Sequence, residues 1–143
     1  MQSLRRWNIR EFIKPTTTPW PLSIPHDDLQ RLIKGYHAVD MDQKWIFLTL
    51  GPDEESIYTV KMIRSWSGCP MMAMKIRAEL GEDGQPRTDR EAQVFELVWE
   101  TEQSVWPMDD FFGSDDKAKE WTREICSWVM EIKLPMEAEE NTQ

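Results

Sequence analysis

The segment Met71–Leu80, with the sequence MMAMKIRAEL, decides the fold class because apolar and charged side chains alternate along it. Alternation with a period of two residues is typical of a half-buried β-strand, whereas an amphipathic helix repeats every three to four residues. One face carries Met72, Met74, Ile76, Ala78 and Leu80, and the other carries Lys75, Arg77 and Glu79. Residues 70–80 are therefore predicted to form a strand whose apolar face packs on a core.

Three further strands are predicted on either side of this one. Residues 44–50 form an apolar run that is too short for a helix, and residues 56–66 and 92–101 alternate apolar and polar positions. Turn residues such as Gly51-Pro52-Asp53 separate consecutive segments. Because short turns join consecutive strands, the pattern predicts an antiparallel meander.

Two helices are predicted around the meander. Pro25, followed by Asp27 and Asp28, is typical of a helix start, and apolar residues recur at helical spacing up to Tyr36. Ser114 is typical of the N-cap of a longer helix over residues 115–133. The apolar stripe of that helix consists of Ala118, Trp121, Thr122, Ile125, Trp128, Val129 and Ile132.

The predicted fold is therefore α+β: a four-stranded antiparallel sheet with a short helix on its N-terminal side and a longer C-terminal helix, packed on one face. Residues 1–134 are expected to form a single domain, in which residues 1–25 are an extended, proline-rich segment anchored by Trp20 and Leu22. Residues 135–143 are expected to form a disordered acidic tail.

The composition limits the classes of partner. The 143 residues include 17 Lys and Arg against 26 Asp and Glu, which gives a net charge of −9. Phosphate-binding surfaces need clustered positive charge, so nucleic acid is not an expected partner. No apolar stretch is long enough for a transmembrane helix, so no membrane contact is expected and the expected location is cytoplasmic. The eight tryptophans predict a tryptophan-rich core, and the two cysteines are expected to be buried thiols.

Sequence motifs for catalysis and metal binding are absent. The chain contains no phosphate-binding glycine loop, no G-x-S-x-G, no H-E-x-x-H and no C-x-x-C. Neither a cofactor nor a metal site is predicted, and no catalytic residue is assigned. The sequence therefore leaves open whether the chain is an enzyme.

Arg64 breaks the alternation of its strand. Together with Trp66 it is predicted to point to the apolar face, where an arginine needs a carboxylate or an aromatic partner. In one interpretation Arg64 closes the core through Asp40 or Asp42. In the other, Arg64 and Trp66 form the floor of a pocket for an anionic or aromatic ligand. The candidate ligand-binding residues are Arg64, Trp66, Asp40, Asp42, Tyr36 and Trp99.

Two short motifs resemble a known pattern. Residues 40–45 read D-M-D-Q-K-W, and residues 64–68 read R-S-W-S-G. The pair resembles small uncharacterised microbial proteins with D-M-x-x-K-W and R-S-W-[ST]-G motifs, which sometimes occur near ADP-ribose-binding macro domains. The resemblance covers residues 25–100 and implies a fold but no activity. A histidine often precedes the arginine in that pattern, and Ile63 occupies this position here, so no role of that histidine carries over.

Three functions are compatible with these patterns. The first is a small soluble binding or accessory module for an unknown protein or small molecule, which the absence of a nucleophile–base pair favours. The second is a small pocket enzyme, of isomerase, cyclase or hydrolase type, acting on an aromatic metabolite. The third is an inhibitor of antitoxin or immunity type, because the acidic charge suits a basic target. The binding module is the preferred interpretation.

Overall fold

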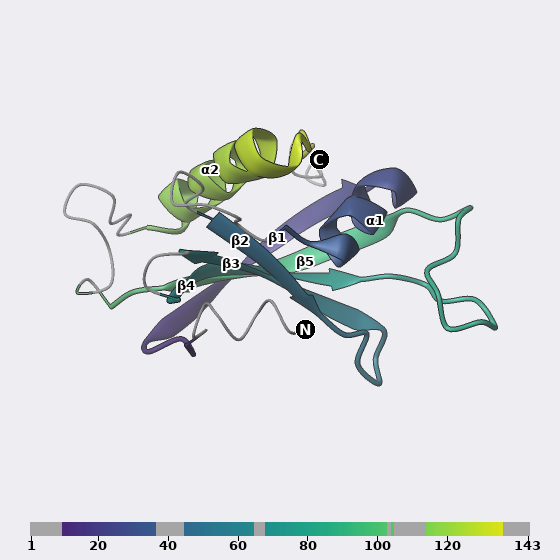
Figure 1. Cartoon of the computed structure of the whole chain (residues 1–143), viewed down its shortest axis with the longest axis horizontal. Helices are drawn as coiled ribbons and strands as arrows, with labels where there is room; N and C mark the ends of the chain where they lie inside the picture. The colour runs from purple at the N-terminus through teal and green to yellow at the C-terminus, as the bar shows by residue number, and fades with distance from the viewer. Residues whose placement is uncertain (1–9, 37–44, 65–67, 103, 105–113, 136–143) are drawn as a thin grey trace.

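The computed structural model describes residues 10–36, 45–64, 68–102, 104 and 114–135. These residues form one sheet of five strands in the order β1-β5-β4-β3-β2, and both described helices lie on one face of it (Figure 1). The strands are β1 (Pro15–Ile24), β2 (Trp45–Leu50), β3 (Ile57–Arg64), β4 (Pro70–Arg77) and β5 (Ala92–Glu100). The helices are α1 (His26–Lys34) and α2 (Asp115–Ile125), and α2 continues as the π-helical turn η3 (Cys126–Met130).

The α+β class, the antiparallel meander and the two helices are confirmed. Strands β2 to β5 pair in chain order, with Met62 opposite Met72 and Met72 opposite Trp99. The C-terminal helix packs on the Met72 side of the sheet, where the Thr122 hydroxyl lies 3.1 Å from the Met72 sulfur. The tail predicted from residue 135 onward lies, except for Pro135, outside the described residues.

The sheet has five strands, and the prediction of four was wrong, because the proline-rich N-terminal segment is itself a strand. β1 pairs antiparallel with β5, from Pro15 opposite Glu100 to Ile24 opposite Ala92. Its buried side chains are Thr18, Trp20, Leu22 and Ile24, and its prolines occupy the exposed positions between or before them. β1 lies at the edge of the sheet, where a missing N–H group removes no ladder bond to a further strand. Trp20 and Leu22 are buried, as the sequence predicts.

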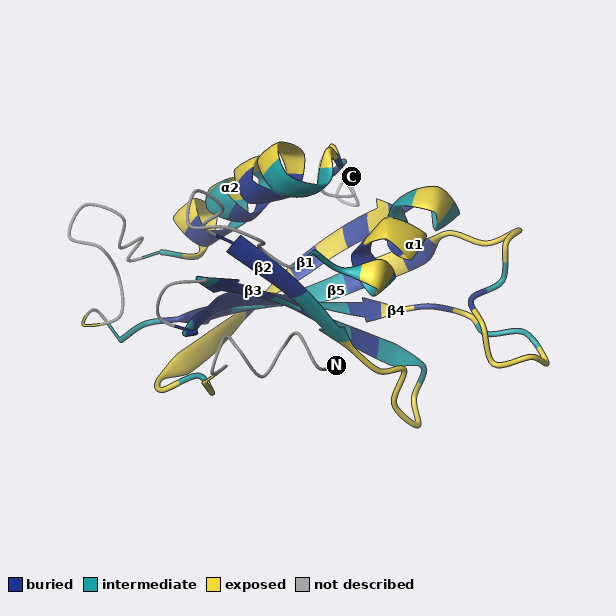
Figure 2. Cartoon of the chain, in the orientation of Figure 1, coloured by how far each residue is buried: buried dark blue, intermediate teal, exposed yellow. Residues whose placement is uncertain are grey.

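The main core lies between the sheet and the helices (Figure 2). Alternate residues of the strands face it, and α1 and α2 contribute Leu29, Leu32, Ala118 and Ile125. A smaller cluster on the other face of the sheet pairs Ile46 with Ile63. Among the described tryptophans, Trp20, Trp45 and Trp99 are buried, Trp121 is half-buried and Trp128 is exposed. The expectation of a tryptophan-rich core therefore applies to only part of this set.

Both helix starts follow their sequence signals. Pro25 is the N-cap of α1, and Asp27 and Asp28 occupy its first turn, at the positive end of the helix dipole. At the start of α2, the Ser114 hydroxyl oxygen accepts a hydrogen bond of 3.3 Å from the Lys117 N–H. This bond satisfies one of the N–H groups that have no partner within the helix.

Gly35 ends α1 and allows its close approach to β2. Its φ of 78° favours glycine, and a Cβ at this position would lie 2.5 Å from the Phe47 carbonyl oxygen. The helix end can therefore lie directly against the backbone of β2. This approach places Tyr36 beside Phe47, with which it forms an isolated β-bridge.

The C-terminal helix differs from the predicted helix over residues 115–133. The α-helix ends at Ile125, and the chain continues as η3 up to Met130, before Glu131 leaves the helix with φ 59°. A π-helical turn contains more residues per turn than an α-helix, so each residue advances less around the axis. Trp128, predicted in the buried stripe, is consequently 62% exposed.

Candidate functional site

Arg64 ends β3 with its guanidinium over the indole ring of Trp45, 5.4 Å from the ring centroid. Trp45 lies directly opposite Arg64 in the β2–β3 ladder, so both side chains share one face. An aromatic partner is what the sequence requires of an arginine at this position. Asp40, Asp42 and Trp66 lie outside the described residues, so their contacts with Arg64 stay predictions.

Trp99 lies in the core at 6% exposure, opposite Met72. It faces the same side of the sheet as Arg64, but β4 lies between their strands. Two strand spacings separate their backbones by about 10 Å. Trp99 therefore contributes to packing under α2, and neither it nor Arg64 lines the cleft that contains Tyr36.

Tyr36 is a predicted site residue that lines a cleft. Its N–H donates to the Phe47 carbonyl at 3.0 Å, and its carbonyl accepts from the Phe47 N–H at 2.8 Å. This bridge fixes the end of α1 against β2. A cleft of about 280 Å³, which we call the α1–η3 cleft, opens between residues at the end of α1 and residues of η3. The residues lining it are Arg31, Lys34, Gly35, Tyr36, Val129, Met130 and Glu131.

The two cations of the α1–η3 cleft, Arg31 and Lys34, lie where their charge stabilises α1. Arg31 lies 3.8 Å from the Asp28 carboxylate and donates to the Glu131 carbonyl oxygen at 3.4 Å. Arg31 and Lys34 occupy the last turn of α1, where positive charge offsets the negative end of the helix dipole. The side chains from η3 are half-buried and apolar. The cleft is therefore better suited to an apolar side chain than to an isolated anion.

Trp128 directly precedes Val129 and Met130, the two η3 residues that line this cleft. Its ring meets that of Trp121 edge to face, with centroids 6.2 Å apart and an interplanar angle of 87°. Glu124 lies one helical turn before Trp128 and is exposed. We call Trp121, Glu124 and Trp128 the Trp128 surface. Sequence reasoning missed it because the apolar spacing placed Trp128 in the core, and nothing in the sequence indicates a π-helical turn.

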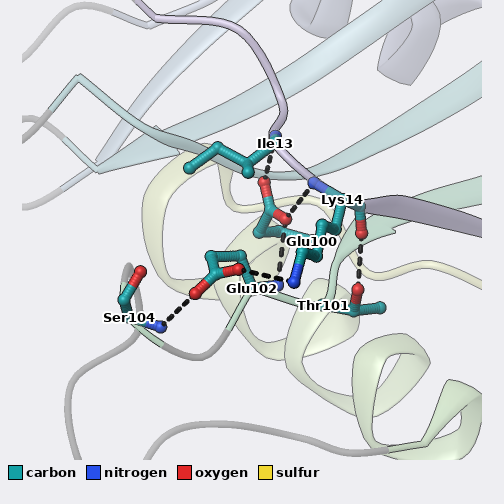
Figure 3. Close-up of polar contacts among 6 residues, drawn as sticks. All are labelled: Ile13, Lys14, Glu100, Thr101, Glu102 and Ser104. Atoms are coloured by element: carbon teal, nitrogen blue, oxygen red, sulfur yellow. Dashed lines mark hydrogen bonds and ion pairs between the residues drawn. The ribbon is translucent and has the colours of Figure 1, made fainter.

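Glu100 is a buried carboxylate that the sequence places on the outer face of its strand. It is 1% exposed and accepts three backbone N–H bonds: from Ile13 and Lys14 at 2.8 Å and from Glu102 at 3.0 Å (Figure 3). The Lys14 carbonyl in turn accepts bonds from the N–H and the hydroxyl of Thr101, at 3.0 and 2.6 Å. These bonds fix the chain where it enters β1, so the role of Glu100 is structural.

A second cleft, of about 500 Å³, opens at the opposite end of β3 and β4. Its lining consists of Glu55, Ser56, Arg77, Ala78, Glu79, Leu80, Glu91 and Gln93. Glu79 is paired with Arg87 at 3.4 Å and with Arg90 at 3.6 Å, and all three side chains are substantially exposed. Exposed ion pairs of this kind are ordinary surface chemistry. In the part of the chain that the structure describes, no cluster of three His, Cys, Asp or Glu side chains is arranged to hold a metal ion.

The buried thiol of Cys126 offers no nucleophile. Burial raises the pKa of this thiol to about 12. The thiolate is the reactive form of cysteine, and its fraction at neutral pH is negligible at such a pKa. Cys126 therefore acts as a small apolar residue of the core.

Comparison with known proteins assigns no family, because no family model, curated protein or solved structure matches the chain. None of the described helices is long and apolar enough to cross a membrane. Of the two motifs noted in the sequence, the structure describes Trp45, Arg64 and Gly68. Trp45 and Arg64 stack, and the Gly68 N–H donates to the Arg64 carbonyl at 2.8 Å. These contacts hold the ends of β2, β3 and β4 together and favour a structural role for the described motif residues.

Proposed function

We propose that this chain is a protein-binding module whose partner contacts the Trp128 surface and the adjoining α1–η3 cleft. The observation that carries the proposal is the 62% exposure of Trp128. Tryptophan is enriched among the residues that contribute most to protein–protein binding, since it combines a large apolar area with a polar N–H group.

The energetic argument follows from the area that Trp128 exposes. Covering its accessible part removes about 150 Å² from water, which stabilises a complex by up to about 4 kcal/mol. The edge-to-face contact with Trp121 already restrains the indole. Less side-chain entropy is therefore lost on binding than for a freely rotating surface residue.

The α1–η3 cleft supplies a recess beside this projecting ring. Its volume of about 280 Å³ lies just below the roughly 300–1,000 Å³ of most small-molecule pockets. Val129 and Met130 form apolar walls, and Tyr36 adds a hydroxyl group. A projection next to a recess is the shape complementarity that protein interfaces use, and the recess suits one large side chain of a partner.

The chemistry of the cleft does not favour catalysis. A pocket enzyme needs an activated nucleophile or a positioned acid and base. The described lining of the cleft contains no histidine, cysteine or serine, and its carboxylate, Glu131, is exposed. Inhibition of an enzyme or toxin by an antitoxin- or immunity-type protein is one form of the proposed activity, since it requires only such a binding surface.

Site-specific photocrosslinking tests the proposal. A photoreactive phenylalanine analogue replaces Trp128 in the native host, and the matched control replaces Leu50, an exposed apolar residue of β2. We expect a crosslinked protein from position 128 and not from position 50. With that partner purified, Trp128→Ala should weaken binding at least about 30-fold and lower the melting temperature by no more than about 5 °C, through loss of the contact with Trp121. Equal crosslinking from both positions, or an unchanged Kd, would refute the proposed surface.

A further inference from the structure

Three exposed glutamates lie within eight residues of Trp128 along α2, η3 and the residue that follows them. Glu124 lies one helical turn before Trp128, Glu120 adjoins Trp121, and Glu131 follows η3, and all three glutamates are exposed. Glu120 lies 3.8 Å from Lys117 in an exposed pair. Neither Glu124 nor Glu131 has a side-chain ion pair among the residues described.

Two arginines near this surface are engaged with other groups, whereas Lys34 and Lys133 are exposed. Arg123 points inward: its guanidinium lies 5.4 Å from the Trp20 ring centroid and donates to the carbonyls of Leu134 and Pro135 at 2.9 and 2.6 Å. Arg31, in the cleft, is directed to the Asp28 carboxylate and a backbone carbonyl. Glu124 and Glu131 thus place negative charge near Trp128 along the chain, within a protein whose net charge is −9.

We propose that the partner presents a basic segment to the Trp128 surface, with lysine or arginine side chains interleaved with apolar ones. This inference rests on the proposed function and names the chemistry of its partner. A cationic side chain over the exposed indole face gains a cation–π contact, while Glu124 and Glu131 lie close enough to pair with neighbouring cations. An apolar side chain of the same segment fills the α1–η3 cleft.

The net charge of the whole molecule also favours a basic partner. A net negative protein attracts a basic segment at distances of about a Debye length and repels an acidic one. Such steering raises the association rate and makes it depend on salt, while the desolvated aromatic contact controls dissociation. A basic partner is thus favoured both by the field of the chain and by the groups next to Trp128.

A matched pair of peptides tests the inference on the full-length chain. Both are fluorescein-labelled helical peptides of sixteen residues with the same leucine stripe, and one carries four lysines where the other carries four glutamates. Binding is measured by fluorescence polarisation at low and high salt. The protein variants are Trp128→Ala and the double variant Glu124→Gln/Glu131→Gln. The control is Glu82→Gln/Glu91→Gln, which removes two exposed carboxylates from the loop before β5.

We expect the lysine peptide to bind at least about 10-fold more tightly than the glutamate peptide, with an affinity that falls as salt rises. The Glu124→Gln/Glu131→Gln variant should lose about 5- to 10-fold toward the lysine peptide, the control less than about 2-fold, and Trp128→Ala at least about 30-fold.

The outcomes separate the two proposals. Equal affinity for both peptides, lost in Trp128→Ala, would overturn the basic partner and leave the protein-binding surface standing. Binding that Trp128→Ala does not weaken would overturn both. Absence of binding to the lysine peptide, or a control as damaging as the Glu124 and Glu131 variant, would also overturn the inference.

Discussion

Replacement of Glu100 by glutamine tests whether its buried carboxylate holds the N-terminal segment on the sheet. With its single oxygen at the Oε2 position, glutamine still accepts from the Lys14 and Glu102 N–H groups but turns an NH₂ group toward the Ile13 N–H. Bonds to a charged acceptor contribute about 1.5–3 kcal/mol and neutral ones about 0.5–1.5 kcal/mol. Losing one bond and weakening two others should therefore cost about 3 kcal/mol.

Thermal and urea denaturation measure this cost. Unfolding entropy of about 2.1 cal/mol/K per residue gives about 0.3 kcal/mol/K for 143 residues, so the melting temperature should fall by about 10 °C. Amide exchange at Ile13 and Lys14 should accelerate more than in β3, because the damage is local. The matched control, Glu91→Gln, changes an exposed residue just before β5 and should cost less than about 0.5 kcal/mol. A cost for Glu100→Gln as small as that of the control would refute the reasoning.

Three further outcomes follow from single side chains. Arg64→Lys should cost about 1 kcal/mol in urea denaturation, since lysine cannot stack a planar group on Trp45; unchanged stability would contradict a structural role. The Ile57 N–H, followed by another backbone N–H, lowers the pKa of Asp53 below its usual 3.8, so its contribution is present above that pH and is lost as the pH falls through the lower folded value. Asp53→Asn should accordingly reduce the loss of stability that occurs as the pH falls below about 4. An unchanged dependence of the unfolding free energy on pH in this range would contradict the prediction. Because burial raises the pKa of Cys126 to about 12, a variant lacking the other cysteine should react with a thiol reagent at pH 8 only as fast as it unfolds, whereas rapid labelling of the native state would show an open site.

The meander was predictable because its information is local. Alternation in three of the four segments indicates which side chains face the core, residues 44–50 form a short apolar run, and short turns fix the order of the strands. β1 carries the same signal, since Thr18, Trp20, Leu22 and Ile24 are every second residue and all are buried. The prolines between them argue against a strand, because proline has no N–H group to donate to a sheet. This argument holds for a central strand, but β1 lies at the edge of the sheet, a position that only the assembled sheet defines.

Glu100 was not predictable for a different reason. Its place on the outer face of β5 follows from the alternation. Its burial, however, depends on Ile13 and Lys14, which precede it in the chain by 87 and 86 positions. No local pattern records that the segment before β1 crosses this end of the sheet. The sequence pattern predicts that this carboxylate is exposed to solvent. In the fold it is a buried hydrogen-bond acceptor, because a distant segment supplies its N–H donors.

The exposure of Trp128 has a mechanical origin in η3. In a continuous α-helix, Trp128 would lie nearer the side of Trp121, seven residues earlier, which is half-buried against the core. The wider turn keeps Cys126 and Ile132 buried, joined by a bond of 3.1 Å from the Ile132 N–H to the Cys126 carbonyl, and turns the intervening tryptophan outward. Local apolar spacing and the final structure thus disagree at one large side chain. The proposed protein contact at the Trp128 surface depends on this outward turn, because an indole packed in the core could not reach a partner.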